Sequence, residues 1–325
     1  MALEVVAPGL ACSVQDLGRP GHYAVGIPPS GAVDLRSAVA ANLLVGNDEG
    51  AALLEIPYMG PVLRSTEPSV IAATGASMLL RVNGQDVPQW ESVAVAAGDE
   101  VSFGYLQSGA RVYLAVAGGI AVPPVLGSRS TYGLGAFGGH EGRTVQTGDL
   151  LPVGSPAPTA RDGRVVPEHL RPQHPRDLDI RVVLGLYDYR LAPEGLALFL
   201  DATWTLSTVA DRTGFRYQGP TLAWQDRVQP FGAGSDPSNI VDAGYPVGSI
   251  QVPGGVEPIV LHRDAVSGGG YASVATVISA DMDAVGQCAP GARTRFRDVS
   301  LNTALDARRH RAEQVRALRR ALQQP

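Results

Sequence analysis

The sequence predicts a mainly β protein, of barrel or sandwich type, with a few short helices. Three observations predict this class. Apolar segments rich in β-branched and aromatic residues are short and stop at Gly or Pro in both halves of the chain. Helical spacing of apolar residues is confined to a few segments. No internal repeat with a period of about 20–50 residues is present, so a solenoid or propeller is not indicated.

The first half contains one predicted helix, for which Asp34 is the candidate N-cap. It covers Asp34–Val45, carries Val39 on its apolar face and ends at Gly46. The other apolar segments of this half are predicted strands: LEVVAP at Leu3–Pro8, SVIAATG at Ser69–Gly75, SMLLRVNG at Ser77–Gly84 and RVYLAVAGG at Arg111–Gly119.

The second half has the same style. A helix is predicted over Pro193–Asp201, because proline is well tolerated in the first turn of a helix. A second short helix is predicted over Asp281–Gln287. The predicted strands are WTLSTV at Trp204–Val209, GSIQV at Gly248–Val252, PIVLH at Pro258–His262 and SVATVISA at Ser273–Ala280.

Residues 154–178 are rich in proline and mixed charge, a composition typical of an extended, poorly packed connector. The connector divides the chain into a β-rich N-terminal half, residues 1–153, and a C-terminal half, residues 179–300. Residues 301–325 form a basic amphipathic helical tail, suited to a membrane or an acidic partner. We expect the tail to pack on its own domain instead, through Leu305, Val315, Leu318 and Leu322.

Composition excludes several classes of function. A net charge of -5 and a pI near 5.7 argue against nucleic acid as the main partner, which requires a basic footprint. No apolar run is long enough to span a membrane, and no secretory signal is visible at the N-terminus, so we expect a cytoplasmic protein. Cys12 and Cys288 lack ligand-like spacing and are expected to be buried thiols. Charged residues make up only 18%, which suggests a surface partly covered by another chain.

The chain contains no lysine. It therefore cannot form a Schiff base, carry a lysine-linked biotin, or supply the lysine of a P-loop. Motifs of serine hydrolases and zinc proteases are also absent, and the histidines do not cluster, so no metal site is predicted. The run GLGAFGGHEGR at Gly133–Arg143 lacks the strand and helix context of a dinucleotide site, although backbone amides in such a loop can bind an anion.

The candidate site residues lie in turns and at strand edges. The segment SVQDLGRPGHYAVGIPPSGAVD at Ser13–Asp34 is too rich in Gly and Pro for a helix or long strand, and it presents polar side chains from a shaped loop. Arginine forks elsewhere suit a small anionic molecule, while a structural salt bridge is the alternative for each of them. The predicted substrate-binding residues are Asp16, Arg19, Ser30, Arg129, Arg143, Arg212, Gln251, Asp264 and Tyr271, with Gly269 and Gly270 serving loop geometry.

The order of motifs resembles one family along almost the whole chain, from about residue 3 to residue 300. In the first half the matching segments are VQDLGRPG, GIPPSGAVD, AANLLVGN, YLAVAGGI, LGSRSTYG and GRTVQTGDLL. In the second half they are DRTGFRYQGP, GSIQVPGG, PIVLHRD, TVISADMDAVGQ and APGARTRF. The family is that of allophanate hydrolase subunit 2 and the C subunit of 5-oxoprolinase, and the resemblance implies a cyclophilin-like β-barrel architecture.

The resemblance also implies partners and a reaction. It implies the B subunit of 5-oxoprolinase, which is similar to allophanate hydrolase subunit 1, and a third subunit of lactam-hydrolase type. In such a complex ATP hydrolysis opens the lactam of 5-oxoproline to give glutamate, and this chain would be active only with its partner. Two alternatives remain open: the carboxyltransferase half of a biotin-dependent urea carboxylase, with biotin carried on a separate domain, and a regulatory protein that antagonises a sensor-kinase inhibitor.

Two departures from the family pattern bear on the site. Val256-Glu257 stands where the family usually has Gly-Gln, and it places a carboxylate where a neutral amide is usual. Ser267-Gly268 stands where the family tends to have Thr-Thr, which removes a hydroxyl. We expect both changes to affect ligand binding and to leave the fold unchanged.

Overall fold

The computed structural model describes residues 1–323, which form two compact units. The N-terminal unit comprises Met1–Arg19, Ser30–His174 and the chain from Glu313 onward. The C-terminal unit comprises Pro20–Pro29 and Pro175–Ala312. The mainly β class with barrel architecture is confirmed, and the units differ from the predicted ranges in assigning residues 20–29 to the second unit and most of the connector to the first.

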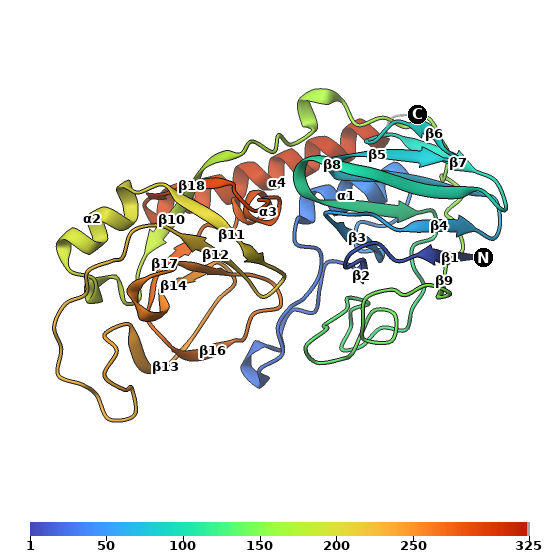
Figure 1. Cartoon of the computed structure of the whole chain (residues 1–325). Helices are drawn as coiled ribbons and strands as arrows, with labels where there is room; N and C mark the ends of the chain where they lie inside the picture. Colours follow the sequence, from blue (N-terminus) through green and yellow to red (C-terminus); the bar gives the residue numbers. More distant parts are fainter. Residues whose placement is uncertain (324–325) are drawn as a thin grey trace. The chain divides into compact units, whose positions relative to one another are not determined.

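The N-terminal unit is built on a nine-stranded sheet, whose strands are blue to green in Figure 1. The sheet runs in the order β2-β3-β8-β4-β1-β9, and β5 joins β6, β7 and β8. The strands are β1 Ala2–Ala7, β2 Ser13–Gln15, β3 Leu53–Pro57, β4 Val62–Ser65, β5 Ser69–Val82, β6 Gln85–Val87, β7 Ser92–Val95, β8 Glu100–Val116 and β9 Leu150–Pro152.

The two long strands β5 and β8 pair with each other, and their pairing is interrupted at Gly75. The sequence predicts separate strands on either side of this glycine, whereas the structure continues one strand through it. Gly75 has a φ of 91°, which only glycine adopts easily, so the chain turns locally without ending the strand. Between Gly75 and Ser77 the register slips, and β8 bulges by extra residues opposite Ala76.

Helix α1, Leu35–Leu44, confirms the predicted helix in this unit. The carboxylate of Asp34 caps it by accepting a 3.0 Å hydrogen bond from the backbone N–H of Ser37. Its buried residues pack with Leu53 and Tyr113 of the sheet in one apolar cluster. A second cluster, which includes Val5, Leu54 and Leu114, fills the other side of the unit.

The C-terminal unit is a closed seven-stranded barrel, in the order β10-β17-β14-β15-β12-β11-β18, with the two-stranded sheet β13-β16 outside it (Figure 1). Closure removes free sheet edges, so every barrel strand has two neighbours. The strands are β10 Asp177–Leu184, β11 Trp204–Ala210, β12 Gly214–Gln218, β13 Asn239–Gly244, β14 Ser249–Gln251, β15 Ile259–Leu261, β16 Gly268–Tyr271, β17 Ser273–Val277 and β18 Arg293–Asp298.

Both predicted helices of the second half are present. Helix α2 covers Pro193–Asp201, as predicted, and α3 covers Met282–Gly286. Phe199 of α2 stacks on Phe296 of β18 with ring centroids 5.0 Å apart, which fixes the helix on the barrel. Residues 1–323 also contain four short 3-10 turns: Tyr23–Val25, Glu168–Leu170, Asp188–Arg190 and Pro253–Gly255.

Part of the predicted connector, at residues 164–166, lies against the N-terminal unit. The backbone N–H of Ser92 donates a 2.9 Å hydrogen bond to the carbonyl of Arg164, so this segment runs along β7. Val166 is completely buried in the apolar cluster beside α1. A proline-rich segment without regular structure can thus still contribute a single side chain to a core.

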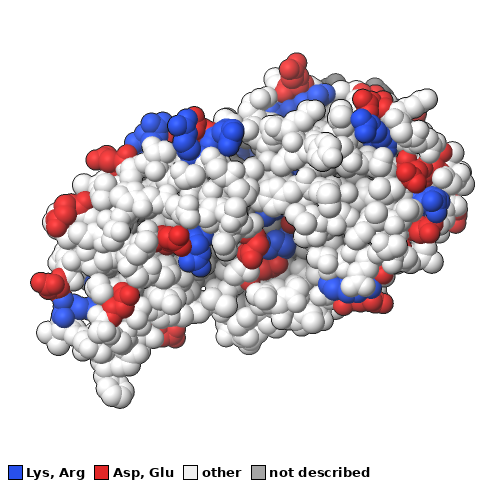
Figure 2. All heavy atoms as spheres, viewed as in Figure 1, with Lys and Arg blue, Asp and Glu red and all other residues white. Residues whose placement is uncertain are grey.

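The tail forms helix α4, Leu301–Gln323. Leu318 and Leu322 are buried with residues of α1, and Val315 packs against them, whereas Leu305 is 39% exposed. The tail therefore packs within the chain, but its apolar residues join the core of the N-terminal unit, not that of the neighbouring half in sequence. On the molecular face in Figure 2 charges of both signs are interspersed without a large patch of one sign.

Candidate functional site

Asp16 closes two loops of the N-terminal unit. It follows β2, and one carboxylate oxygen accepts hydrogen bonds from the backbone N–H of Gly18 at 2.7 Å and from the hydroxyl groups of Ser128 and Ser130. The other oxygen accepts a 2.6 Å bond from the backbone N–H of Arg129. The carboxylate of Asp16 thus accepts four hydrogen bonds from its own chain, and these bonds fix the conformation of the loop at Leu126–Thr131.

Arg19 is 1% exposed and serves the same loops. Its guanidinium donates to the carbonyl of Ser130, and the guanidinium carbon lies 5.0 Å from the centroid of the Phe137 ring. This is a cation–π contact away from water, where such contacts are strongest. Because almost none of Arg19 reaches the surface, it positions backbone and is not placed to touch a ligand directly.

The glycine-rich run after this loop is explained by packing. Gly138 and Gly139 both have positive φ, and a Cβ at Gly138 would lie 2.1 Å from the carbonyl oxygen of Ser130. A Cβ at Gly139 would lie 1.8 Å from the hydroxyl oxygen of Thr131. The N–H of Gly139 donates to the carbonyl of Arg129. The glycines thus let the run lie directly on the Ser128–Thr131 loop.

Ser30 precedes, in the chain, the residues of a buried polar network that the sequence did not single out. Ser30 is completely buried with a φ of 49°. Further along the chain, the backbone N–H of Val33 donates a 2.8 Å bond to Glu55, which also accepts a 2.9 Å bond from the hydroxyl of Tyr113. Burial, followed by the charge of Glu55, raises the pKa of Tyr113 well above its usual value. The only signal in the sequence was a lone glutamate between apolar residues in LEI, which alternation alone does not distinguish from an exposed position.

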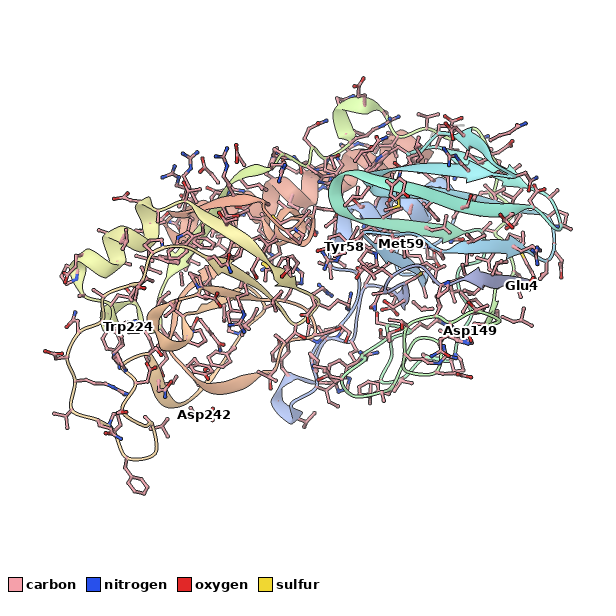
Figure 3. The ribbon with its side chains drawn as sticks, in the orientation of Figure 1. Glu4, Tyr58, Met59, Asp149, Trp224 and Asp242 are labelled. Carbon is pink, nitrogen blue, oxygen red and sulfur yellow. The ribbon has the colours of Figure 1, made fainter. Side chains whose placement is uncertain are left out.

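The predicted arginines of this unit differ in how they are used. Arg143 forms a two-pronged ion pair with Asp149, labelled in Figure 3, at 2.7 and 2.9 Å, and also contacts Glu141. The pair lowers the pKa of Asp149 to about 2. Arg129 donates through Nε to the carbonyl of Val122. For Arg143 the structural salt bridge considered in the sequence is what the structure contains.

In the C-terminal unit, Arg212 and Asp264 form a similar pair. The carboxylate of Asp264 accepts bonds of 2.7 and 3.2 Å from the Arg212 guanidinium, and its side chain is only 7% exposed. Tyr23, from the segment Pro20–Pro29, lies close enough to Asp264 and Arg263 for their charges to affect its pKa. Burial is the main cause of the raised pKa of this tyrosine. The middle of the N-terminal loop motif, Pro20–Pro29, therefore belongs to the same unit as the Arg212–Asp264 pair.

Tyr245 joins three predicted residues of the C-terminal unit. Its hydroxyl lies 2.5 and 2.6 Å from the carbonyl oxygens of Gly269 and Tyr271, and accepts a 2.8 Å bond from the N–H of Tyr271. The side chain of Gln251 also hydrogen-bonds this hydroxyl. Burial is the first cause of the raised pKa of Tyr245, so the phenol stays protonated and keeps its donor. Gly269 allows the close approach, because a Cβ there would lie 3.2 Å from the tyrosine ring.

Tyr271 is the one predicted site residue of this group with a largely accessible side chain, at 42% exposed. It borders a cavity of about 310 Å³ together with Gly270, Ala233 and the β13 residues Asn239 and Val241. Figure 3 labels Asp242, which follows them on β13. The sheet β13-β16 therefore carries both the predicted Gly269–Tyr271 segment and the walls of a cavity.

The two departures from the family pattern have structural explanations. Glu257 forms an ion pair with Arg216 at 3.1 Å, so its carboxylate is partly neutralised within the unit. Gly268 pairs with Gly244, and a Cβ at Gly268 would lie 3.1 Å from the carbonyl oxygen of Ala243. A side chain here needs a small backbone shift, which glycine avoids.

The predicted residues divide between the units. Asp16, Arg19, Ser30, Arg129 and Arg143 belong to the N-terminal unit, and Arg212, Gln251, Asp264, Gly269, Gly270 and Tyr271 to the C-terminal unit. Within residues 1–323, no group of three or more His, Cys, Asp or Glu side chains is placed to hold a metal ion. None of the helices in the same range is long and apolar enough to cross a membrane.

Comparison with known proteins identifies the family. Residues 25–298 match the model of the carboxyltransferase domain, subdomain A and B. The chain belongs to this family. It is 35% identical over 307 residues to the C subunit of 5-oxoprolinase from Escherichia coli, and the match covers 94% of both proteins. The resemblance found in the sequence motifs is confirmed.

Larger relatives contain this chain as a part. A putative urea carboxylase of Emericella nidulans is 36% identical over 94% of this chain, which spans about a quarter (25%) of that relative's length. The crystal structure of the urea carboxylase of Kluyveromyces lactis matches 98% of this chain and 29% of its own, with 34% identity and a TM-score of 0.91. The fold is therefore that of the carboxyltransferase region of these proteins.

Proposed function

We propose that the chain is the C subunit of a 5-oxoprolinase-type complex, which opens the lactam of 5-oxoproline to glutamate at the expense of ATP. The observation that carries this proposal is the extent of the match, which covers 94% of this chain and 94% of the Escherichia coli C subunit of 5-oxoprolinase. The urea carboxylase relative, by contrast, is about four times longer than the matched region.

The cavity beside Tyr271 is the part of this chain that faces the substrate. Tyr271 offers an accessible hydroxyl, and Asn239, its pairing partner on β13, offers an amide that can both donate and accept. Lactams and amides present one carbonyl and one N–H, so such paired groups suit them. A volume of about 310 Å³ is at the small end of ligand pockets, as a metabolite of this size requires.

The residues behind the cavity hold it in place. Tyr245 links the backbone of Gly269 and Tyr271 to the side chain of Gln251 on β14. The Arg212–Asp264 pair likewise connects the turns around β12 and β15. These residues position the site and do not themselves attack the substrate, because no activated nucleophile is among them.

The partner subunits supply what this chain lacks. Without lysine, the chain cannot provide the phosphate-binding lysine of a P-loop, so we assign ATP binding to another subunit of the complex. The partners are a B-type subunit, similar to allophanate hydrolase subunit 1, and a third subunit of lactam-hydrolase type. Activity then appears only in the assembled complex.

The test is reconstitution. The chain is purified alone and with both partner subunits, and ADP release and glutamate formation are measured with and without 5-oxoproline. The proposal predicts 5-oxoproline-dependent turnover in the complex and none for the folded chain alone. Turnover by the isolated chain at the rate of the complex would contradict partner dependence, and a complex that forms but ignores 5-oxoproline would contradict the substrate.

A second candidate is the carboxyltransferase half of a urea carboxylase-like enzyme. It is favoured by the TM-score of 0.91 to the urea carboxylase of Kluyveromyces lactis over 98% of this chain. The absence of lysine means that biotin would have to be carried on another chain. The same reconstituted preparation distinguishes the two candidates when it is given a biotin carboxylase, a biotinylated carrier, bicarbonate and urea in place of 5-oxoproline.

A further inference from the structure

A second, polar cavity lies in the N-terminal unit, away from every residue assigned above. Its volume is about 240 Å³. One side is formed by β5 and β8 at the register shift between Gly75 and Ser77. The other side is formed by residues 168–174, in the segment predicted as a connector. Its lining includes Ser77, Gln89, Trp90, Glu168, Arg171 and His174.

The inner wall of this cavity is held in an unusual conformation. Trp90 has a φ of 62°, which is rare and costly for a bulky residue. Two backbone hydrogen bonds hold it there: its N–H donates to the carbonyl of Ala73, and its carbonyl accepts from Val166, at 2.8 and 2.9 Å. Gln89 is also fixed, because its amide bonds the backbone of Ala76 and Met78. Bulges and strained residues that are held this firmly gather at binding sites.

The outer wall is equally fixed. Arg36 of α1 donates a 2.6 Å bond to the carbonyl of Leu170, and this leucine packs against the core beside α1. Arg171 donates through Nε to the carbonyl of Val166 at 2.8 Å. Glu168 and Arg171 are thus held three residues apart on one turn. Among residues 1–323, neither of them forms an ion pair.

His174 completes the wall as a neutral group. Burial is the main cause of its lowered pKa, and the nearby Arg36 adds to the effect, while a hydrogen bond with the backbone of Gly75 opposes it. Its Nε2 atom is buried and has no hydrogen-bond partner in the described part of the chain. Near pH 7 the ring is therefore uncharged.

We propose that this cavity binds a small α-amino acid as its zwitterion. The carboxylate pairs with the free end of the Arg171 guanidinium, and the ammonium pairs with Glu168. The ammonium also donates to the hydroxyl oxygen of Ser77, whose own proton is donated to Gln107. A cation and an anion on one rim favour a ligand that carries both charges, because a ligand with one charge is attracted by one group and repelled by the other. At about 30 Å³ per water molecule, the cavity has room for a ligand of roughly eight non-hydrogen atoms, as in small amino acids.

The alternative is that Glu168 and Arg171 are simply solvated charges on an exposed turn. It predicts no saturable binding, since exposed single charges have weak, screened interactions. It does not account for the strained Trp90 or for the buried, unpartnered nitrogen of His174. This inference does not depend on the proposed function, because it concerns other residues.

The test is titration calorimetry on the full chain with L-serine, L-leucine and L-glutamate as probes. Propionate and propylamine, which carry one charge each, serve as comparisons. We expect saturable binding of at least one amino acid, and at least tenfold weaker binding of both single-charge compounds. Arg171→Gln and Glu168→Gln should each weaken it by roughly 10- to 100-fold, the usual value of a charge-assisted hydrogen bond.

Matched controls are the exposed residues Arg161 and Asp162 of the same segment, changed to Gln and Asn, which should leave binding unchanged. Thermal melts verify folding of every variant, and Glu168 is exposed, so its variant is expected to fold. The proposal is overturned if no amino acid binds, if propionate binds as tightly as the amino acids, or if either charge-removing variant binds like the unmodified chain.

Discussion

The Asp16–Arg19 loops of the N-terminal unit and the Tyr245–Tyr271 sheet of the C-terminal unit are built from similarly dense motifs, but they differ in what they leave accessible. Asp16 and Arg19 are 9% and 1% exposed, and their polar groups bind their own chain. Tyr271 is 42% exposed and borders a cavity. A dense motif can therefore mark a loop that must be shaped, whereas the proposed ligand contact is an accessible polar side chain on a fixed backbone.

The same chemistry serves both regions. In each region one buried side chain accepts a hydrogen bond from a backbone N–H group. Asp16 accepts from Arg129, and Tyr245 accepts from Tyr271; we call these two side chains hubs. A buried backbone group without a partner costs free energy, so each hub stabilises an irregular segment. The supported segments differ in accessibility. In the first unit, the Ser128–Thr131 loop is covered by Gly138 and Gly139, whereas in the second unit the side chain of Tyr271 is accessible.

The largest expected effect comes from removing the N-terminal hub. Asp16→Ala leaves Ser128, Ser130 and the N–H of Arg129 without their acceptor, and should lower the free energy of unfolding by about 3 kcal/mol or more. Thermal denaturation should show a fall in Tm of about 10 °C. Asp179→Ala, which removes only the exposed ion pairs with Arg295 and Arg297, is the control and should cost less than about 1 kcal/mol. Equal losses of stability in the two variants would contradict the proposal that Asp16 stabilises these loops.

The glycine-covered loop offers a second test. Gly139→Ala places a Cβ against the hydroxyl of Thr131 at a φ of 56°, so overlap and backbone strain together should cost about 2–4 kcal/mol. Gly133→Ala, in the same run, meets no atom within 4 Å and has no positive φ, so it should be nearly neutral. Chemical denaturation of both variants measures the difference. A neutral Gly139→Ala would show that the run does not lie on the loop.

A smaller effect is expected from the C-terminal hub. Tyr245→Phe removes the hydroxyl that the N–H of Tyr271 requires, and should cost about 1–2 kcal/mol. The loss should be local, so hydrogen exchange should accelerate in Gly268–Tyr271 and not in the barrel strand β14. Uniform acceleration throughout the unit would contradict the assignment of Tyr245 to the outer sheet.

The smallest effect concerns pH. The Arg143 ion pair lowers the pKa of Asp149 to about 2, below the value of 3.8 for a free carboxyl group. The pair therefore contributes stability that is fully present above about pH 4 and is lost as the pH falls towards 2. Because Arg143 is partly exposed, this contribution should be about 1 kcal/mol or less. Arg143→Gln should flatten the stability profile between pH 4 and 2, and an unchanged slope would contradict the pair.

Much of the fold could be predicted from sequence because its signals are local. Asp34 caps α1 three residues away, and Pro193 starts α2 where the sequence places it. The burial of Val166 and the link between Asp16 and Ser130, 114 residues apart, depend on the folded chain and have no local signal. For the same reason Tyr245, Glu55 and Tyr113 were missed, although the motifs around Gly269 and Asp16 were found.

The central claim is that this chain meets its substrate at Tyr271, and the most direct test is a kinetic comparison in the reconstituted complex. Tyr271→Ala should raise the KM for 5-oxoproline by about tenfold or more without changing Tm, because it removes an exposed contact. Tyr105→Ala, which removes another exposed tyrosine (91%) in the N-terminal unit, should leave KM and kcat unchanged. Unchanged kinetics for Tyr271→Ala, or equal losses for the two variants, would contradict the account.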